Sequence, residues 1–237
     1  RIDSIIISGK SGLEAIKGKY YIDSTGESDV ISAYGGELMK GGKKEYQLPM
    51  SIMFFVQKAK RFGTKYPVPD GFFDWKPYEK RNELPMTSFR NYGRGSKSIK
   101  VKVPRFDSTN TEELTQAEIE AHRSMMRVME FFQKKHNWVL DYFSPIIGIR
   151  EGTRIVGEYI LTVEDCRTAR QFDDVIAVGT YQLDAHDPSD DKRTYILPKS
   201  ELKVPPYQIP LRSLMPKNME SIMVAWRNLS ADQLAMS

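Results

Sequence analysis

Arg154 and Glu158 stand four residues apart, and both side-chain types can do chemistry. The apolar pattern predicts a strand over residues 154–161, in which the two side chains point to the same face, about 13 Å apart at about 3.3 Å per residue. A guanidinium is a planar donor that suits a carboxylate or a phosphate. The pair is therefore a candidate for substrate binding and catalysis. The alternative is a ladder of surface ion pairs, which contributes little energy.

His186 is a candidate acid or base. A strand predicted over residues 177–186 would place Gln182, Asp184 and His186 on one face. The neighbouring carboxylates of Asp184 and Asp187 would favour the protonated imidazole, which makes it a credible proton donor near neutral pH. The alternative is a solvated histidine in a turn.

Thr25, Gly26 and Asp29 follow an apolar strand that reaches Ile22. Small residues at the end of a strand let a ligand approach the backbone closely, and ligands of open α/β sheets bind at the carboxyl ends of strands. The segment is thus a candidate binding site. The alternative is an ordinary turn closed by an Asx cap.

Composition excludes several classes of function. The chain has 237 residues, of which 40% are hydrophobic and 28% charged, with a formal net charge of +4. No apolar run approaches the ~18 residues of a membrane helix, so we expect no membrane partner. The single cysteine, Cys166, excludes a cysteine-rich metal site, and we expect no metal. The basic stretch 90–105 reads as a solvated strand and loop, so we expect no nucleic acid.

Helices and strands must hold these candidates in place, and the pattern predicts an α+β fold with a mixed or antiparallel sheet and packed helices. We expect a helix from Thr115 to about His136. A capping box at Thr115 and Glu118 would open it, and Ile119, Met126, Met129 and Phe132 would share its apolar face. The other expected elements are a hairpin over 2–22, strands at 50–56, 98–103, 146–149 and 222–225, a short helix opening at 30–34, a helix over 162–170 and an irregular stretch over 58–98.

Six segments, in order, resemble the bacterial FAD-dependent oxidoreductases with a glutathione-reductase-type flavin fold. They are YYIDSTGESDV, LPMSIMFFV, ELTQAEIEAHRSMMRVMEFF, IIGIREGTRIVGEYILTVEDC, FDDVIAVGTYQLDAHDP and PPYQIPLRSLMPKNMESIMVAWRNLSADQLAMS. Together they cover nearly all of residues 1–32, 47–56 and 111–237, whereas residues 58–105 match poorly. Each segment alone is weak, and their common order carries the resemblance.

The resemblance implies FAD as the cofactor and hydride transfer to or from it on a small polar substrate. It also implies cofactor-binding positions, which are Thr25, Gly26, Asp29, Arg227, Asn228 and Ser230. It keeps Arg154, Glu158 and His186 as catalytic candidates, with Arg154 holding the substrate. Two residues depart from the family pattern. Trp226 stands where glycine is usual, which puts backbone approach to the flavin in doubt, and Gln233 stands where histidine is common.

The resemblance further implies that the chain is the central part of a longer enzyme, without the family's opening Gly-x-Gly-x-x-Gly unit and closing helix. We expect residues 1–45 to end one part of the FAD-binding domain, residues 46–215 to form the substrate domain and residues 216–237 to return to the FAD-binding domain. The piece alone would be inactive and bind FAD weakly. Apolar strand edges at Ile5, Ile7, Tyr21, Ile22, Met223 and Val224 would favour self-association. The sequence does not indicate a cellular location.

A different class of function rests on the aromatic loop 62–78. Its aromatic residues could stack on sugar rings, which would make the chain a non-enzymatic carbohydrate-binding module.

Overall fold

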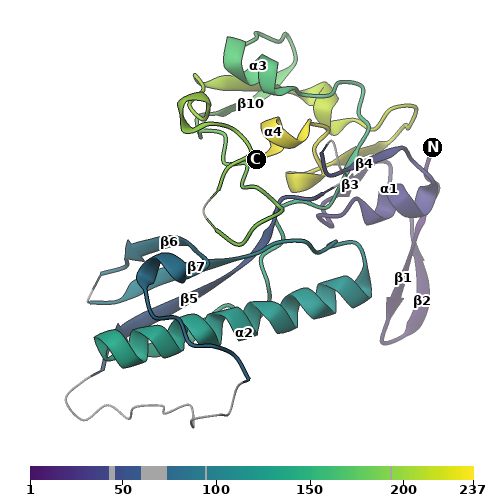
Figure 1. The fold of residues 1–237 in the computed structure, drawn as a ribbon. Helices are drawn as coiled ribbons and strands as arrows, with labels where there is room; N and C mark the ends of the chain where they lie inside the picture. The colour runs from purple at the N-terminus through teal and green to yellow at the C-terminus, as the bar shows by residue number, and fades with distance from the viewer. Residues whose placement is uncertain (43–45, 60–73, 94, 193) are drawn as a thin grey trace. The chain divides into compact units, whose positions relative to one another are not determined.

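The computed structural model describes residues 1–42, 46–59, 74–93, 95–192 and 194–237 (Figure 1). Its contacts divide the chain into two compact units. The first unit comprises residues 1–48, 151–185 and 195–237, and the second comprises residues 49–150 and 186–194. Helices and several small sheets, mostly antiparallel, make up both units, so the predicted α+β class is confirmed. The predicted domain limits stay a prediction, and residue 45 lies outside the described residues.

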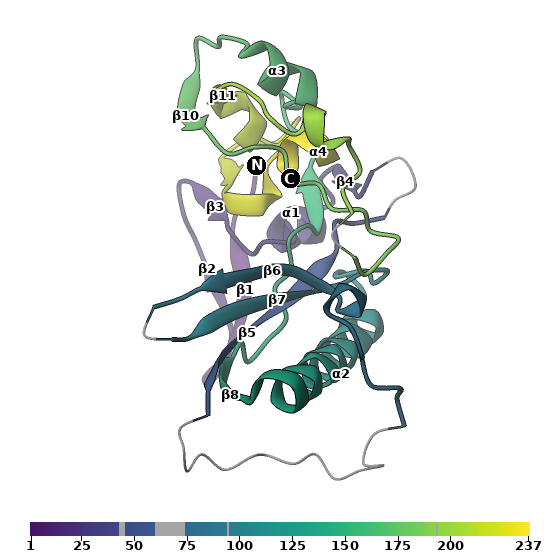
Figure 2. The ribbon, with the colours of Figure 1, turned by 60° about the vertical axis from the view of Figure 1, so that its left-hand side comes forward.

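The second unit is built on a four-stranded antiparallel sheet (Figure 2). Its strands, in spatial order, are β6 (Met86–Asn91), β7 (Lys97–Val103), β5 (Met50–Lys58) and β8 (Trp138–Phe143). The long helix α2 (Thr111–His136) packs on one face of this sheet. Alternate residues of β5, Ile52, Phe54 and Val56, are fully buried under α2, as the two-residue period of a strand requires.

Helix α2 begins one turn earlier than the sequence predicts. Asn110 is its N-cap and accepts a hydrogen bond from the Glu113 amide at 3.0 Å, whereas the Thr115 hydroxyl bonds back to the Thr111 carbonyl. The predicted capping box at Thr115 is therefore wrong. Ile119 is 47% exposed and does not belong to the apolar face, which is formed instead around Val128.

The first unit consists of short elements. The hairpin β1 (Ile5–Gly9) and β2 (Gly12–Ile16) is followed by β3 (Tyr21–Asp23), which pairs in parallel with β12 (Ile222–Val224). The other pairs are β4 (Leu38–Lys40) with β9 (Thr153–Ile155), and β10 (Val175–Gly179) with β11 (Tyr207–Pro210). Its helices are α1 (Asp29–Tyr34), α3 (Val163–Thr168) and α4 (Gln233–Met236), with short 3-10 turns such as η4 (Trp226–Asn228).

The strand predicted over 146–149 is absent, since Gly148 forms only an isolated bridge with Ser51. Three other predicted strands are wrong in extent. The hairpin ends at Ile16, because residues 21–23 take a partner that lies 200 residues further along the chain. The strand predicted over 154–161 ends at Ile155, so Arg154 and Glu158 do not share a strand face. The strand predicted over 177–186 ends at Gly179, so His186 is not on it. Strands β6 and β8 were not predicted.

The apolar strand edges are only partly exposed. Tyr21 and Val224 are buried in a core of the first unit, which corrects the expectation for these two. Ile22 is 69% exposed, and Ile7 in the hairpin is 39% exposed. Self-association through these edges stays a prediction. No helix among the described residues is long and apolar enough to cross a membrane.

The core under α2 provides a first test of the fold. Phe132 is 2% exposed, and its ring stacks on those of Phe89 and Trp138 at 5.4 and 5.5 Å between centroids. We expect Phe132→Ala to lower the free energy of unfolding by about 3–5 kcal/mol, because it leaves a cavity between helix and sheet. Denaturant titration measures the change. Ile119→Ala, on the exposed side of the same helix, should cost less than about 1 kcal/mol, and equal losses would contradict the packing.

Candidate functional site

The buried carboxylate of Asp23 organises the predicted binding segment. Its Oδ1 accepts hydrogen bonds from the amide and the hydroxyl of Thr25, at 3.0 and 2.7 Å. Its Oδ2 accepts from the amides of Val30 and Ile31, at 3.0 and 3.2 Å. The helix α1 is thereby capped by a residue six positions upstream, since its own N-cap Ser28 makes no side-chain cap. The Asx-capped turn that the sequence left as an alternative is therefore present.

The same carboxylate reaches the far end of the chain. The side-chain amide of Asn228 donates to Asp23 Oδ1 and to the Asp23 carbonyl, both at 3.2 Å. The amide of Ala225 also donates to that carbonyl, at 2.9 Å. Thr25, Gly26 and the segment 227–228 are thus held together, and their predicted role in binding a cofactor stays a prediction.

Gly26 has a specific reason to be glycine. Its φ is +90°, and a Cβ at this position would lie 2.5 Å from Arg227 Nη2. Arg227 is close to Glu27, with 3.5 Å between Nη2 and Oε1, and Glu27 Oε2 accepts from the amide of Thr153 at 3.1 Å. Glu27 therefore anchors the loop to β9. The sequence analysis named neither Asp23 nor Glu27 as a site residue. Asp23 could have been found, because it ends an apolar strand just before the start of a helix.

Two buried polar atoms in this segment have no hydrogen-bond partner among the described residues. They are Asn228 Oδ1 and Arg227 Nε. Asn228 is fully buried, and the Arg227 side chain is 12% exposed. Buried polar groups are normally paired, so the two unpaired atoms on successive residues call for an explanation.

The remaining predicted cofactor residues differ in their surroundings. Ser230 is fully buried, and its hydroxyl accepts from the Gly157 amide at 3.0 Å. Asp29 is exposed in the first turn of α1, and its amide donates to the Thr25 hydroxyl at 3.0 Å. Trp226 has a φ of +65°, and its side chain is 71% exposed, with the Arg227 guanidinium 4.5 Å from the ring centroid.

Arg154 lies in a buried network rather than on an open face. It is 1% exposed and forms an ion pair with Glu151, which is fully buried, while its Nη2 donates to the Gly41 carbonyl at 2.9 Å. Glu151 Oε2 also accepts from the amide of Leu48 at 2.6 Å and from Gln233 Nε2 at 2.9 Å. This network joins the segment 41–48, strand β9 and helix α4.

Gln233 has a structural role at the position where the family commonly has histidine. Its Nε2 donates to the Tyr46 carbonyl at 2.6 Å as well as to Glu151. Glu158, the partner predicted for Arg154, is exposed, and its amide donates to the Met215 carbonyl at 2.9 Å. The catalytic roles of Arg154 and Glu158 stay a prediction.

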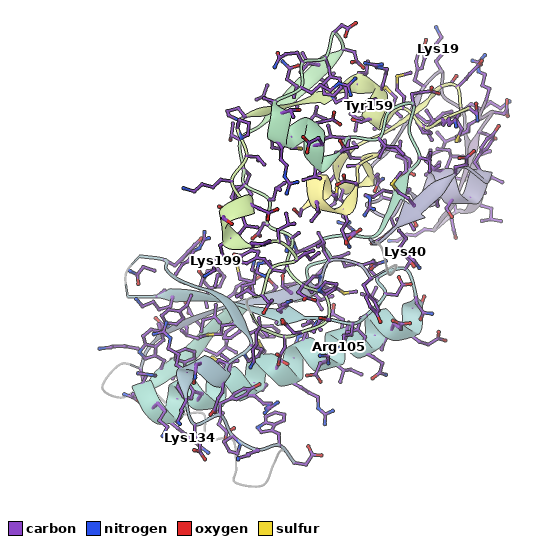
Figure 3. All side chains as sticks on the ribbon, turned by 45° about the horizontal axis from the view of Figure 1, so that its top comes forward. Lys19, Lys40, Arg105, Lys134, Tyr159 and Lys199 are labelled. Carbon is purple, nitrogen blue, oxygen red and sulfur yellow. The ribbon has the colours of Figure 1, made fainter. Side chains whose placement is uncertain are left out.

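His186 belongs to the second unit, in the segment 186–194. It is 4% exposed. The segment is held by Lys102 of β7, whose buried ammonium is 3.1 Å from Asp190 Oδ1. It is also held by Arg105 (labelled in Figure 3), which follows β7 and whose Nε donates to the Ser189 carbonyl at 2.9 Å. Burial lowers the pKa of Lys102, and the Asp190 carboxylate partly offsets that effect. Lys102 and Arg105, two cations of the basic stretch 90–105, therefore bind groups of the same chain.

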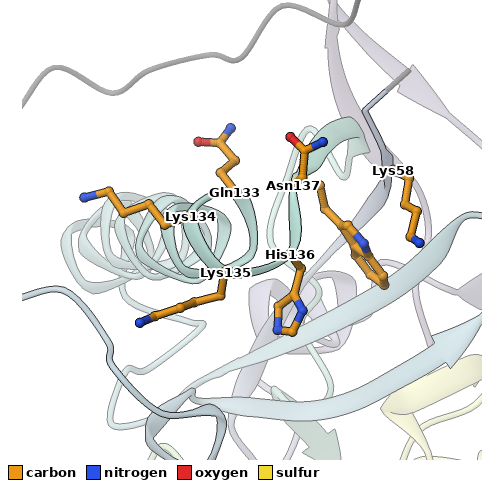
Figure 4. A pocket seen from close by; sticks show the side chains of 7 residues that line it. Lys58, Gln133, Lys134, Lys135, His136 and Asn137 are labelled. Atoms are coloured by element: carbon orange, nitrogen blue, oxygen red, sulfur yellow. The ribbon is translucent and has the colours of Figure 1, made fainter. Parts of the chain in front are cut away.

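Two pockets lie in the second unit, and no predicted site residue lines either of them. A pocket of about 660 Å³ at the C-terminal end of α2 is lined by polar and basic side chains with Trp138 (Figure 4). A second pocket, of about 530 Å³, is lined mainly by apolar residues of α2 and β8.

Of the loop 62–78, residues 62–73 lie outside the described residues. Trp75 donates to Glu130 on α2, and Tyr78 lies under the Arg127 guanidinium. The sugar-binding role of that loop stays a prediction.

Metal binding and thiol chemistry are considered next. The described residues hold no group of three or more His, Cys, Asp and Glu side chains that could bind a metal ion. Burial, reinforced by the charges of Asp232 and Asp165, raises the pKa of the Cys166 thiol to about 11. A thiol that stays protonated near neutral pH is a poor nucleophile.

Comparison with known proteins gives one match. The model of a family described as FAD dependent oxidoreductase matches residues 1–237, which is the whole chain. No curated protein and no solved structure gave a significant match.

The Asp23 carboxylate supplies a test of the site's framework. We expect Asp23→Asn to lower the free energy of unfolding by about 1–3 kcal/mol, because one oxygen becomes an amide nitrogen that faces backbone donors. Asp29→Asn is the control, since Asp29 is exposed and loses only its interaction with the helix terminus. Thermal and denaturant unfolding measure both. A variant Asp23→Asn as stable as the wild type would show that the carboxylate is dispensable.

The Arg154–Glu151 pair supplies a second test. We expect Arg154→Ala to cost about 3–5 kcal/mol of stability, because it leaves the Glu151 carboxylate buried and unpaired. The double variant Glu151→Gln/Arg154→Met removes both charges and keeps the volume, so it should recover most of that loss. Denaturant unfolding of both proteins gives the comparison. Equal losses in the single and double variants would mean that charge pairing is not what Arg154 contributes.

Proposed function

The chain belongs to the FAD-dependent oxidoreductase family, which supports a flavin oxidoreductase role, and we propose that its first unit supplies part of the flavin site. The observation that carries this proposal is the pair of unpartnered buried atoms, Asn228 Oδ1 and Arg227 Nε, beside the Thr25–Gly26 turn. FAD offers many donors and acceptors on its ring, ribose and pyrophosphate, so it could supply partners for these two atoms.

The residues that would hold FAD fall into two groups. Thr25 and Gly26 form a turn on which the Arg227 guanidinium packs, and Asn228 Oδ1 and Arg227 Nε present an acceptor and a donor without partners. Ser230 would contribute its hydroxyl hydrogen, since its oxygen already accepts from Gly157. When bound, FAD supplies the acceptor or donor of a hydride, and the protein binds and orients it.

We propose a small polar substrate. Two residues are candidates for exchanging its proton, Glu158 in the first unit and His186 in the second, and each is proposed by itself. An exposed carboxylate such as Glu158 is accessible to a substrate. Arg154 is better suited to a positioning role than to holding the substrate, because Glu151 already neutralises its charge. Through Glu151 and Gln233 it would fix helix α4, which follows the segment 226–230.

We also propose that the 237 residues function within a longer protein and that they bind FAD weakly by themselves. The support is the resemblance to a family whose members bring a glycine-rich phosphate-binding unit to the same flavin.

Flavin content tests the proposal. We expect the full-length protein that contains this sequence to purify with flavin absorbance bands, and Asn228→Ala and Arg227→Gln each to lower the ratio of flavin to protein, since each removes one atom that would contact FAD. Arg167→Ala is the control, because Arg167 makes an ion pair with Glu201 in the same unit, away from the turn. Absorbance spectra before and after incubation with excess FAD give the ratio.

Two results would contradict the proposal. A colourless full-length protein that takes up no FAD would remove the flavin role of this chain, and two variants with wild-type flavin content would remove the assigned residues. Titration of FAD into the 237-residue chain tests the remaining part, and micromolar or tighter binding would show that the chain does not need a further unit.

A further inference from the structure

The face of the four-stranded sheet opposite α2 carries a row of side chains that no function assigned above uses. Arg90 of β6 pairs with Ser98 of β7, Ser98 pairs with Phe55 of β5, and Phe55 pairs with Tyr142 of β8. Cross-strand partners point to the same face of a sheet. We call these four residues, with the adjoining Tyr92, the aromatic row.

The rings of the aromatic row form one cluster. Phe55 lies at its centre, 4.8 Å from Tyr92 with an interplanar angle of 64°, and 6.1 Å from Tyr142 with an angle of 40°. Tyr92 is 68% exposed and Tyr142 is 58% exposed. The three aromatic rings therefore form an apolar surface that faces solvent and carries the two tyrosine hydroxyl groups.

Hydrogen-bonding and charged groups flank the rings at both ends. Beside Tyr142, the side chain of Gln57 donates to Asp141 Oδ1 at 3.2 Å, and Asp141 stays exposed. At the other end Arg90 is exposed, and among the described residues its guanidinium forms no ion pair. Arg90 thus offers a planar two-nitrogen fork that matches a carboxylate.

This arrangement matches the chemistry of a sugar chain. A sugar ring has an apolar C–H face, which stacks on aromatic rings, and a rim of hydroxyl groups, which Gln57, Asp141 and the tyrosine hydroxyls can bond. Three steps between neighbouring strands span about 14 Å at about 4.8 Å each, which suits a short chain of sugars better than one sugar. A carboxylate on one sugar would complement Arg90.

Other occupants fit less well. A single nucleic-acid strand carries a phosphate on every nucleotide and needs a track of cations. Here an exposed carboxylate, Asp141, stands at one end of the row, and Lys102 on the same strand as Ser98 is paired with Asp190. Contact between two copies of the chain is one of the outcomes that the experiment below distinguishes.

We propose that the aromatic row is a binding surface for an oligosaccharide that contains a uronic acid. The surface lies wholly in the second unit and needs no flavin. None of its residues belongs to the loop 62–78 or to the residues assigned to the flavin site. The test of this surface is therefore independent of the flavin proposal.

Calorimetric titration with trigalacturonic acid, and with neutral galactotriose for comparison, tests the proposal without added FAD. We expect saturable binding of the acid by the full chain. Removing two stacking rings in Tyr92→Ala/Tyr142→Ala should weaken it about tenfold or more. Arg90→Gln should abolish the preference for the acid over the neutral sugar. Tyr181→Ala, a tyrosine 61% exposed in the first unit, is the matched control and should bind like the wild type.

The variants change exposed side chains, and circular dichroism checks that they fold. Several outcomes would overturn the proposal. The first is no saturable binding of the acid by the wild type, and the second is equal binding by the double tyrosine variant. The third is a single-stranded oligonucleotide that binds more tightly and loses affinity in the same variant. The fourth is a dimer of the wild type that this variant dissociates, which would assign the row to contact between copies.

Discussion

The buried carboxylate of Asp23 is the interaction on which the first unit depends. A carboxylate taken out of water is costly unless several donors replace its hydration. Asp23 obtains them from the turn that follows it, from the first turn of α1 and from Asn228, which lies 205 residues away. The parallel pairing of β3 with β12 brings Asn228 within reach. The end of a strand, the start of a helix and the segment 225–228 therefore form one structural unit, and none of them can move without exposing an unpaired charge.

A second buried charge network holds other segments of the first unit together. Arg154, Glu151 and Gln233 satisfy one another and the carbonyls of Gly41 and Tyr46. An amide at position 233 donates from one nitrogen to two acceptors, which accounts for glutamine there in structural terms. Arg154 Nε is nevertheless buried without a hydrogen-bond partner among the described residues, as are Asn228 Oδ1 and Arg227 Nε beside the glycine turn. Each such atom calls for an explanation, and a bound ligand is the one that we propose for the two atoms beside the glycine turn.

Local patterns in the sequence predicted the elements whose stability is local. Helix α1, most of α2 and the capping box of Thr162 with Asp165 follow from residues that are near one another in the chain. The wrong predictions have two related causes. Either two residues compete to cap the same helix, or the length of a strand depends on a partner that is distant in the sequence. Asn110 offers a cap before Thr115 can, and a strand continues only as far as its partner does, so β9 ends at Ile155. The roles of Asp23 and Glu27 likewise arise from contacts across the chain. Thr25 and Arg227 were both named as cofactor-binding positions, but by the resemblance to the family rather than by a local pattern.

Trp226 illustrates how a departure from a family pattern can be accommodated. Its φ of +65° is a left-handed conformation that costs a residue with a side chain roughly 1–2 kcal/mol, and glycine would adopt it freely. The backbone is nevertheless held there, since β12 ends just before it and Asn228 is fixed by Asp23 just after it. The indole is directed outward, 71% exposed, and stacks with the Arg227 guanidinium at 4.5 Å. A cation–π contact of this kind helps to fix the arginine that also reaches Gly26 and Glu27. The large side chain therefore does not fill the turn, and the strain at residue 226 is balanced by the order it gives to Arg227.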